Sequence, residues 1–282
     1  MAASATEQLV EALTAIGRET APTAADPVVL SDRAGRLVLR VGEVVVKAHG
    51  AGTDPDALAA RLRLAGEPVW LAPVGGVRRA HGRLVTVWPA AEAVAGDDPD
   101  TAPWVEGAQL LARLHRSPLP HGVPAAGFAG GVERAVGRLG AGSAADAVRQ
   151  AFGGLGPLRG GTAVVHGDWH LGQVVRRAGW RLVDVDDAGL GDPAWDLARP
   201  AALFAVGLLD PALWARFLDA YRAADGPAVP ATGDPWPALD TPARAAVTRL
   251  AAQAVVRAEG LGMDETDVLL VDACIRMSGD RR

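Results

Sequence analysis

Residues 165–198 read VHGDWHLGQVVRRAGWRLVDVDDAGLGDPAWDLA, and this stretch is the most informative part of the chain. Asp168 follows a His-Gly pair, and an amide side chain, Gln173, lies five residues later. Strand-like runs at 173–177 and 180–185 flank an Ala-Gly turn, which predicts a β-hairpin that leads to Asp184. The stretch therefore places three metal- or proton-binding side chains around one loop and one hairpin.

This order of side chains is typical of phosphoryl transfer. That reaction needs a carboxylate to orient the attacking hydroxyl, oxygen ligands for magnesium and a cation on the nucleotide phosphates. Kinases place an amide five residues after the first aspartate and a second, metal-binding aspartate beyond a hairpin. Asp168, Gln173 and Asp184 follow this order. Lys47, the only lysine in a chain with 28 basic residues, marks a position where an ammonium is kept instead of a guanidinium.

The chain before residue 89 is expected to consist mainly of short strands. Apolar residues alternate in several runs, and turn-like pieces separate these runs. The expected elements are, in order, a helix at 5–17, strands at 27–32, 36–41 and 43–48, a helix at 54–66 capped by Asp54, and strands at 69–77 and 83–89. Lys47 lies near the end of the third strand.

The rest of the chain is expected to be mainly helical. The expected helices cover 104–116, 131–153, 193–207, 211–224, 240–260 and 264–277, and strands at 164–168, 173–177 and 180–185 interrupt them. We therefore expect an α+β fold with a nucleotide-binding lobe at 1–88 and a catalytic and substrate-binding lobe at 89–282. Residues 89–103, rich in Ala, Asp, Gly and Pro, are the expected hinge.

The two motifs together resemble those of the aminoglycoside phosphotransferase family, H-G-D-x-x-x-x-N followed by D-x-x-D-A-G-x-G-D-P-x-x-D-L-A. Here they read HGDWHLGQ and DVDDAGLGDPAWDLA. The resemblance implies a bilobal protein-kinase-like fold, ATP and Mg²⁺ as cofactors, and transfer of the γ-phosphate to a hydroxyl of a small molecule. The HGDxHxGQ form is also similar to the maltokinase and glucosamine-kinase branch, which keeps sugar kinases among the candidates.

The resemblance assigns roles to individual residues. It implies that Asp168 is the catalytic aspartate, that Asp184 and Gln173 bind Mg²⁺, and that Lys47 holds the α- and β-phosphates. Gln173 departs from the family pattern, which usually has asparagine at this position. Its amide oxygen lies one methylene further from the backbone, so a degenerate metal site with weak activity is the alternative.

Other motif residues are expected to support the loop. His166 is interpreted as a structural histidine beneath it, and Asp196 as the aspartate that braces it from the next helix. Asp192 is the expected N-cap of that helix, with Pro193 at its first position. His170 is interpreted as structural or adjacent to the substrate.

Two features of the expected nucleotide site are weak. No glutamate lies in the helix at 54–66 to pair with Lys47, and Asp56 is the best replacement there. The turn between the first two strands contains a single glycine, Gly35, where a glycine-rich loop is expected. The adenine is expected to bind backbone groups near Val87 and Trp88.

Composition restricts the partners and the compartment. The net charge of −5 disfavours general nucleic-acid binding, which depends on basic patches. No uninterrupted apolar run approaches about 18 residues, so no membrane span is expected. One cysteine, Cys274, excludes an intramolecular disulfide, and with no secretory signal at the N-terminus a cytoplasmic location is expected. The oligomeric state is not indicated.

The leading hypothesis is a kinase for an aminoglycoside or another cationic antibiotic, with a sugar or amino sugar as the alternative acceptor. The carboxylates of Asp184, Asp186, Asp187 and Asp192 favour a cationic substrate, although Asp186 and Asp187 are equally well explained as solvated loop charges. A nucleotide-binding pseudokinase that acts as a regulatory module is the alternative of a different class. A protein kinase is disfavoured because no A-P-E-like element follows residue 190.

Overall fold

The computed structural model describes residues 5–33, 35–93, 101–158 and 160–279. The chain divides into two compact units. One comprises the described residues of Met1–Ala93 together with Gly122–Pro124 and Val175–Val185, and the other comprises those of Val94–His121, Ala125–Val174 and Asp186–Arg282. The expected boundary at residue 88 stays a prediction.

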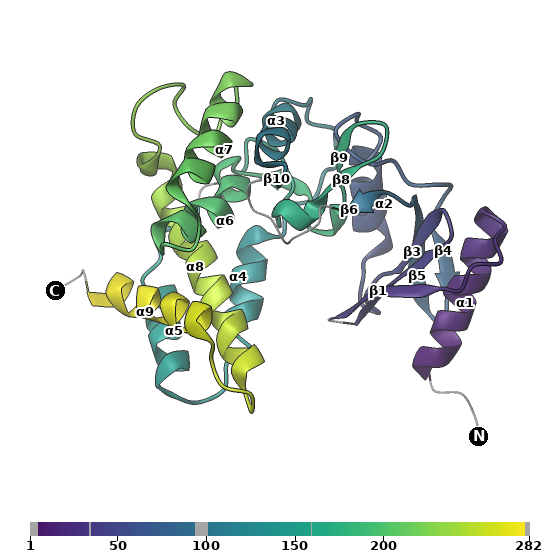
Figure 1. Ribbon diagram of the computed structural model, residues 1–282, viewed down its shortest axis with the longest axis horizontal. Coiled ribbons are helices and arrows are strands. Elements are labelled where there is room, and N and C mark those ends of the chain that lie inside the picture. Colours follow the sequence, from purple (N-terminus) through teal and green to yellow (C-terminus); the bar gives the residue numbers. More distant parts are fainter. Residues whose placement is uncertain (1–4, 34, 94–100, 159, 280–282) are drawn as a thin grey trace. The chain divides into compact units, whose positions relative to one another are not determined.

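The first unit is built on a five-stranded antiparallel sheet with the order β1-β2-β3-β5-β4 (Figure 1). Its elements are α1 (Ala5–Thr20), β1 (Val28–Arg33), β2 (Arg36–Val41), β3 (Val44–Ala48), α2 (Pro55–Leu64), β4 (Arg78–Ala80), β5 (Arg83–Pro89) and β6 (Glu92–Ala93). The hairpin strands β8 (Val174–Arg176) and β9 (Trp180–Leu182) join β6 in a small second sheet.

Helix α1 covers one face of the main sheet. Its Leu13 is fully buried in one apolar cluster with Leu39 and Val46, which alternate with side chains on the opposite face. A Cβ on Gly17 would lie 2.7 Å from the Cβ of Val41, so the helix can approach β2 only with glycine there. Because successive strand residues alternate, Lys47 follows Val46 onto the face that α1 does not cover.

The second unit is helical. Its helices are α3 (Trp104–His115), α4 (Phe128–Val136), α5 (Ser143–Gly153), α6 (Ala194–Ala205), α7 (Pro211–Ala223), α8 (Trp236–Ala258) and α9 (Glu265–Gly279). The long helix α8 packs against α4, α5, α6 and α9. The strands β7 (Ala163–Val165) and β10 (Gly189–Gly191) pair antiparallel, with Val165 opposite Gly189. The expected α+β class, with β-rich N-terminal and helical C-terminal parts, is confirmed.

Two expected elements were wrong. Residues 69–77 form no strand: Pro73 lacks a backbone N–H, and Gly75 turns the chain with a φ of +70°. Isolated backbone hydrogen bonds, such as Leu71 N to Leu182 O at 2.9 Å, replace a ladder. The single helix expected at 131–153 is two helices, because the chain between α4 and α5 turns through Gly142 at a φ of +138°.

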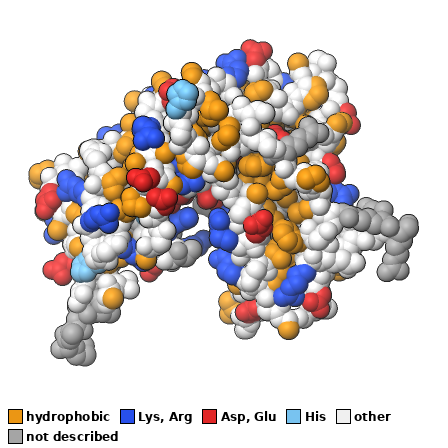
Figure 2. All heavy atoms as spheres, turned by 180° about the vertical axis from the view of Figure 1, so that it is seen from behind, with side chains coloured by type: hydrophobic (Ala, Val, Ile, Leu, Met, Phe, Trp, Pro, Cys, Tyr) orange, Lys and Arg blue, Asp and Glu red, His pale blue; other side chains and the backbone are white. Residues whose placement is uncertain are grey.

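Residues 94–100 of the expected hinge lie outside the described residues. In the described part of the chain, no helix combines the length and the apolar character that crossing a membrane requires. On the face drawn in Figure 2, acidic and basic side chains are mixed, and neither sign covers that face. The expectation that the protein binds no nucleic acid stays a prediction.

Candidate active site

The loop that carries Asp168 is held from helix α6. The backbone N–H of His166 donates to Oδ2 of Asp196 at 2.6 Å, and that of Gly167 donates to Oδ1 at 2.8 Å. Asp196 is 1% exposed, so two charge-assisted hydrogen bonds compensate a buried carboxylate. These contacts match the bracing role that the sequence predicts for Asp196, and the imidazole of His166 is fully buried beneath the loop.

Gly167 allows the loop to turn sharply before Asp168. Its φ is +80°, in the region that favours glycine, and a Cβ there would lie 2.1 Å from the carbonyl oxygen of Asp187. The backbone before Asp168 therefore touches the segment that follows the hairpin. Any larger residue at position 167 must displace one of the two segments.

A buried polar network stands behind Asp196, and sequence reasoning missed it. Nε2 of His115, on α3, lies 2.9 Å from Oδ2 of Asp196, and its Nδ1 lies 2.7 Å from the hydroxyl of Tyr221 on α7. The N–H of Ala228 donates to that hydroxyl at 3.0 Å. Burial raises the pKa of Tyr221 far above its ordinary value of 10.0, so the phenol stays protonated. The network locks α3, α6 and α7 around the loop.

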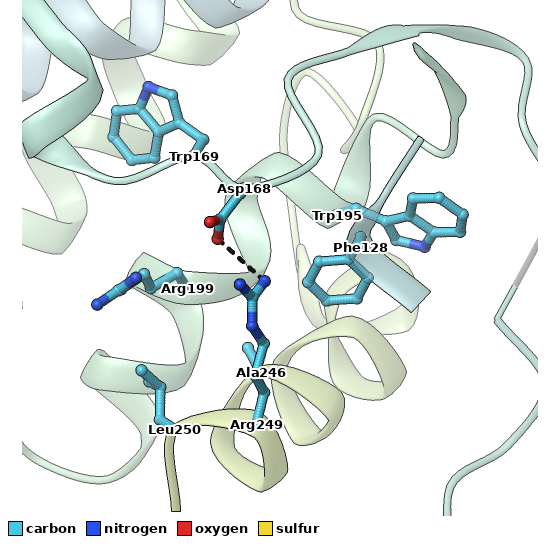
Figure 3. A pocket seen from close by; sticks show the side chains of 8 residues that line it. All are labelled: Phe128, Asp168, Trp169, Trp195, Arg199, Ala246, Arg249 and Leu250. Atoms are coloured by element: carbon cyan, nitrogen blue, oxygen red, sulfur yellow. Dashed lines mark ion pairs between the residues drawn. The ribbon is translucent and has the colours of Figure 1, made fainter. Parts of the chain in front are cut away.

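The Asp168 carboxylate pairs with an arginine that no motif indicated. Nη1 of Arg249, on α8, lies 2.9 Å from Oδ1 of Asp168, and the two side chains are 19% and 28% exposed. Figure 3 shows Arg249 rising from α8 toward the carboxylate, with Phe128 and Trp195 to one side and Arg199 to the other. The rings of Phe128 and Trp195 are stacked at 5.5 Å between centroids.

Arg199 brings a second guanidinium to the same cavity. It follows Asp196 on α6 by three residues and is partly buried. Burial lowers its pKa, the nearby Asp168 carboxylate opposes that shift, and the nearby Arg249 adds to it. No pattern in the sequence singles out Arg199 or Arg249, because both depend on helices that come together only in the folded chain.

His170 and Gln173 contact each other in the turn after Asp168. Nδ1 of His170 accepts a hydrogen bond from Gly172 N at 3.1 Å. The other ring nitrogen, Nε2, lies 3.3 Å from the amide nitrogen of Gln173. This pair of contacts gives His170 a structural role. Gln173 is 9% exposed, and its amide group already contacts a protein side chain, that of His170.

In the first unit, Lys47, the only lysine of the chain, forms an ion pair with Asp184, the aspartate that the sequence predicts to bind Mg²⁺. Nζ of Lys47 donates to Oδ1 of Asp184 at 2.6 Å, and their side chains are 11% and 31% exposed. Asp184 has a φ of +65°, an uncommon backbone conformation for a residue with a side chain. The hairpin thus presents Asp184 to β3 at some conformational cost, as functional residues often do.

The other predicted nucleotide-binding residues are less clearly placed for that role. Asp56 lies exposed in the first turn of α2, and its pairing with Lys47 stays a prediction. Gly35 turns the chain before β2 with a φ of +70°, and its carbonyl accepts a hydrogen bond from Arg83 at 2.7 Å. Val87 O already accepts from Val74 N at 2.7 Å, and the indole of Trp88 donates to a threonine hydroxyl. The adenine contact also stays a prediction.

The remaining acidic residues of the motif have partners within the second unit. The Asp192 carboxylate accepts a hydrogen bond from Ala194 N at 2.9 Å, but α6 begins at Ala194 and its N-cap is Pro193, one residue later than predicted. Asp187 lies 3.8 Å from the guanidinium of Arg134, and its carbonyl accepts from the N–H of Gly127 at 2.8 Å. Asp186 has one carboxylate oxygen buried. These carboxylates are therefore poor evidence for a cationic substrate.

The donor chemistry agrees with Mg²⁺. The carboxylate of Asp184 and the amide of Gln173 offer the hard oxygen ligands that this ion takes, and it keeps waters and phosphate oxygens as its other ligands. No group of three or more His, Cys, Asp or Glu side chains gathers among the described residues. A protein-only metal cage of such side chains is therefore not formed there. Asp184 lies in the first unit and Gln173 in the second, and a Mg²⁺ site that combines them stays a prediction.

Comparison with known proteins identifies the family. The model of the phosphotransferase enzyme family, APH, matches residues 23–239. Because this match spans well over half of the chain, the protein belongs to that family and is a small-molecule phosphotransferase. No curated protein matches the sequence.

Solved structures share the kinase-like fold at low sequence identity. Choline kinase LicA from Streptococcus pneumoniae has a TM-score of 0.62 and 15% identity, over 98% of this chain and 100% of that one. A thermostable mutant of aminoglycoside phosphotransferase APH(4)-Ia, with AMP-PNP and hygromycin B, has a TM-score of 0.59 and 15% identity, over 96% and 100%. Spectinomycin phosphotransferase APH(9)-Ia, with ADP and spectinomycin, has 0.58 and 11%, over 94% and 93%. The expected fold is confirmed.

Proposed function

We propose that the protein transfers the γ-phosphate of ATP to a hydroxyl of a small molecule that approaches Asp168. The observation that carries this proposal is the contact of Lys47 with Asp184 at 2.6 Å. The sequence predicts roles around nucleotide phosphates for both residues, and 137 positions separate them. In the free protein this ion pair compensates both charges, and in the proposal the phosphates take over Lys47 and Mg²⁺ takes over Asp184 when the nucleotide binds.

The residues have distinct tasks in this proposal. Asp168 accepts a hydrogen bond from the acceptor hydroxyl and takes its proton as transfer proceeds. The bond from the γ-phosphorus to the β–γ bridging oxygen breaks, a bond from the acceptor oxygen to that phosphorus forms, and ADP leaves. Lys47 holds the α- and β-phosphates as a point charge. Asp184 and Gln173 would hold Mg²⁺, which when bound neutralises charge on the phosphates.

Two solved relatives in fold support the use of ATP. The APH(4)-Ia structure contains AMP-PNP, and the APH(9)-Ia structure contains ADP. Their second ligands are hygromycin B and spectinomycin, and another relative in fold is a choline kinase. An aminoglycoside or another cationic antibiotic is therefore one acceptor class for this chain. A sugar or amino sugar, suggested by the HGDxHxGQ form, is the other.

Titration with ATP and Mg²⁺ tests the nucleotide half of this proposal. Calorimetry on the whole protein should show ATP binding that weakens in Lys47→Ala and loses its Mg²⁺ dependence in Asp184→Asn. Arg78→Ala is the control that also removes a positive charge from the first unit, because Arg78 forms an exposed ion pair with Glu19 at 2.9 Å. ATP affinity equal in wild type and all three variants would refute the assignment of Lys47 and Asp184.

Transfer itself separates a kinase from a pseudokinase. Labelled phosphate from γ-labelled ATP should appear on an acceptor from a panel of antibiotics, sugars and amino sugars. ATP binding without Mg²⁺-dependent turnover would favour the pseudokinase, and Gln173→Asn then tests the metal site. Restored turnover in that variant would place the defect in the longer side chain at position 173.

A further inference from the structure

The cavity that contains Asp168 carries a net positive charge. Among the described residues that line this cavity, the charged ones are Asp168, Arg199 and Arg249. Two guanidinium groups therefore share one carboxylate, which leaves one positive charge in excess. Apolar and aromatic side chains, including Phe128 and Trp195, form most of the remaining wall.

Arg249 is held in place by its surroundings. A Cβ on Gly131, in α4, would lie 3.2 Å from the guanidinium carbon of Arg249, which is closer than most real contacts. A side chain at position 131 would thus press on the guanidinium, and glycine leaves room for it. The ion pair at 2.9 Å to Asp168 fixes the other side of the group. Arg249 is therefore ordered by two neighbouring elements before any ligand arrives.

Arg199 lacks a compensating charge of its own. Within the described part of the chain, no ion pair or side-chain hydrogen bond involves its guanidinium, and Asp168 is already paired with Arg249. Partial burial deprives this cation of some of its water, and a bound anion would compensate for that loss. Burial also lowers the pKa of Arg199, and the nearby Asp168 carboxylate opposes that shift.

The position of these groups bears on the acceptor. An acceptor that places its hydroxyl at the free oxygen of Asp168 lies next to Arg249, which holds the other oxygen. Guanidinium groups bind carboxylate and phosphate with two parallel hydrogen bonds, and they repel an ammonium. The acidic residues that favour a cationic substrate in the sequence, Asp184, Asp187 and Asp192, have partners elsewhere.

We propose that the acceptor carries an anionic group, a carboxylate or a phosphate, beside the hydroxyl that is phosphorylated, and that Arg199 and Arg249 bind this group. The inference rests on the proposed function, because Asp168 is taken as the residue that orients the hydroxyl. It names the substrate class of that site and replaces the preference for a cationic antibiotic.

Matched acceptors test the charge directly. Glucose, glucuronate and glucosamine differ in one neutral, anionic or cationic group, and glycerol, glycerate and 3-aminopropane-1,2-diol repeat the comparison on a shorter chain. Hygromycin B and spectinomycin represent the antibiotics. Two readouts are taken for each compound: the melting temperature of the protein, and phosphate transfer from γ-labelled ATP.

Variants assign the effect to the two arginines. Arg199→Gln and Arg249→Gln should each lower kcat/KM for anionic acceptors about 10- to 100-fold, the loss of a hydrogen bond to a charged group. The rise in melting temperature with anionic compounds should shrink in parallel. Arg199→Lys and Arg249→Lys keep the charge and should retain part of both effects. Arg244→Gln, on α8 in an exposed pair with Asp240 at 3.2 Å, should change neither.

Three results would overturn the inference. The first is Asp168-dependent transfer to a cationic or neutral compound with a higher kcat/KM than to any anionic one. The second is an equal loss for every acceptor in the arginine variants, which would show that the guanidinium groups act on the transferred phosphate or on the position of Asp168 and not on the charge of the acceptor. The third is an anionic series that raises the melting temperature of wild type no more than that of Arg199→Gln. Failure of the proposed function looks different, because transfer then is absent or independent of Asp168 while anion-dependent melting persists.

Discussion

Replacement of Gly167 by alanine, compared with the same replacement at Gly207, separates the effect of backbone strain from the effect of moving the loop that carries Asp168. Gly167 and Gly207 both have a φ of +80°, and both lie in the second unit. A Cβ on Gly207 meets nothing within 4 Å, whereas a Cβ on Gly167 would lie 2.1 Å from Asp187 O. Each alanine variant should therefore lose about 1–2 kcal/mol of stability from the left-handed conformation. Only Gly167→Ala has the additional clash.

The clash at position 167 predicts a loss of catalytic rate. Real Cβ contacts essentially never fall below 3.0 Å, so the backbone before Asp168 must move by about 1 Å. A misplacement of about 1 Å lowers the rate of an oriented reaction about 100-fold. Gly167→Ala should therefore lower kcat about 100-fold, and Gly207→Ala should leave kcat unchanged.

Urea unfolding and steady-state phosphate transfer, measured on wild type and on both variants, check these values. Folded variants with equal kcat would show that the contact of Gly167 with Asp187 does not position Asp168. A loss of kcat in Gly207→Ala as large as in Gly167→Ala would show that strain anywhere in the unit is enough.

Three further predictions concern the buried groups. Tyr221 is the only tyrosine, and burial raises its pKa, so near-ultraviolet absorbance of the folded protein should show no phenolate as pH passes 10.0. The free energy of unfolding should fall above that pH, because the unfolded chain releases the phenol proton and the folded chain does not. A reversible titration near pH 10 in the folded protein would contradict this. Cys274 is fully buried, and burial raises its pKa to about 12, so iodoacetamide should label it only when the protein unfolds. Rapid labelling of the native protein would contradict its buried position. In Asp196→Asn an amide NH₂ replaces one carboxylate oxygen and faces a backbone N–H, so a donor meets a donor. Urea unfolding should show a loss of about 2–4 kcal/mol of stability, and phosphate transfer should show a lower kcat. Unchanged stability would contradict the bracing contacts.

The sequence predicted the parts of the site that depend on short spacings. Asp196, in the second motif, follows His166, in the first, by 30 positions, and the structure joins them at 2.6 Å. The sequence assigned separate roles to Lys47 and Asp184 and expected Asp56 as the partner of Lys47, so their ion pair was not predicted. Alternation and helical periodicity located most strands and helices, because these periods depend only on neighbouring residues.

The parts that the sequence did not predict depend on contacts between distant helices. His115 and Tyr221 are 106 positions apart, and Arg249 reaches Asp168 only because α8 packs against α6 and α4. No spacing rule records such a contact. Local propensity also failed where Pro73 and Gly142 interrupt otherwise regular patterns, since a single residue with a fixed or unusual φ outweighs its neighbours.

Phosphate transfer by Asp168→Asn is the most direct test of the central claim that this carboxylate orients the acceptor hydroxyl. The variant keeps the size of the side chain and removes its charge, and ATP binding, measured by calorimetry, should persist because Lys47 and Asp184 are intact. With an acceptor that wild type phosphorylates, the account predicts that kcat falls at least about 100-fold while ATP affinity is retained. Transfer at the wild-type rate by a variant that binds ATP normally would contradict it.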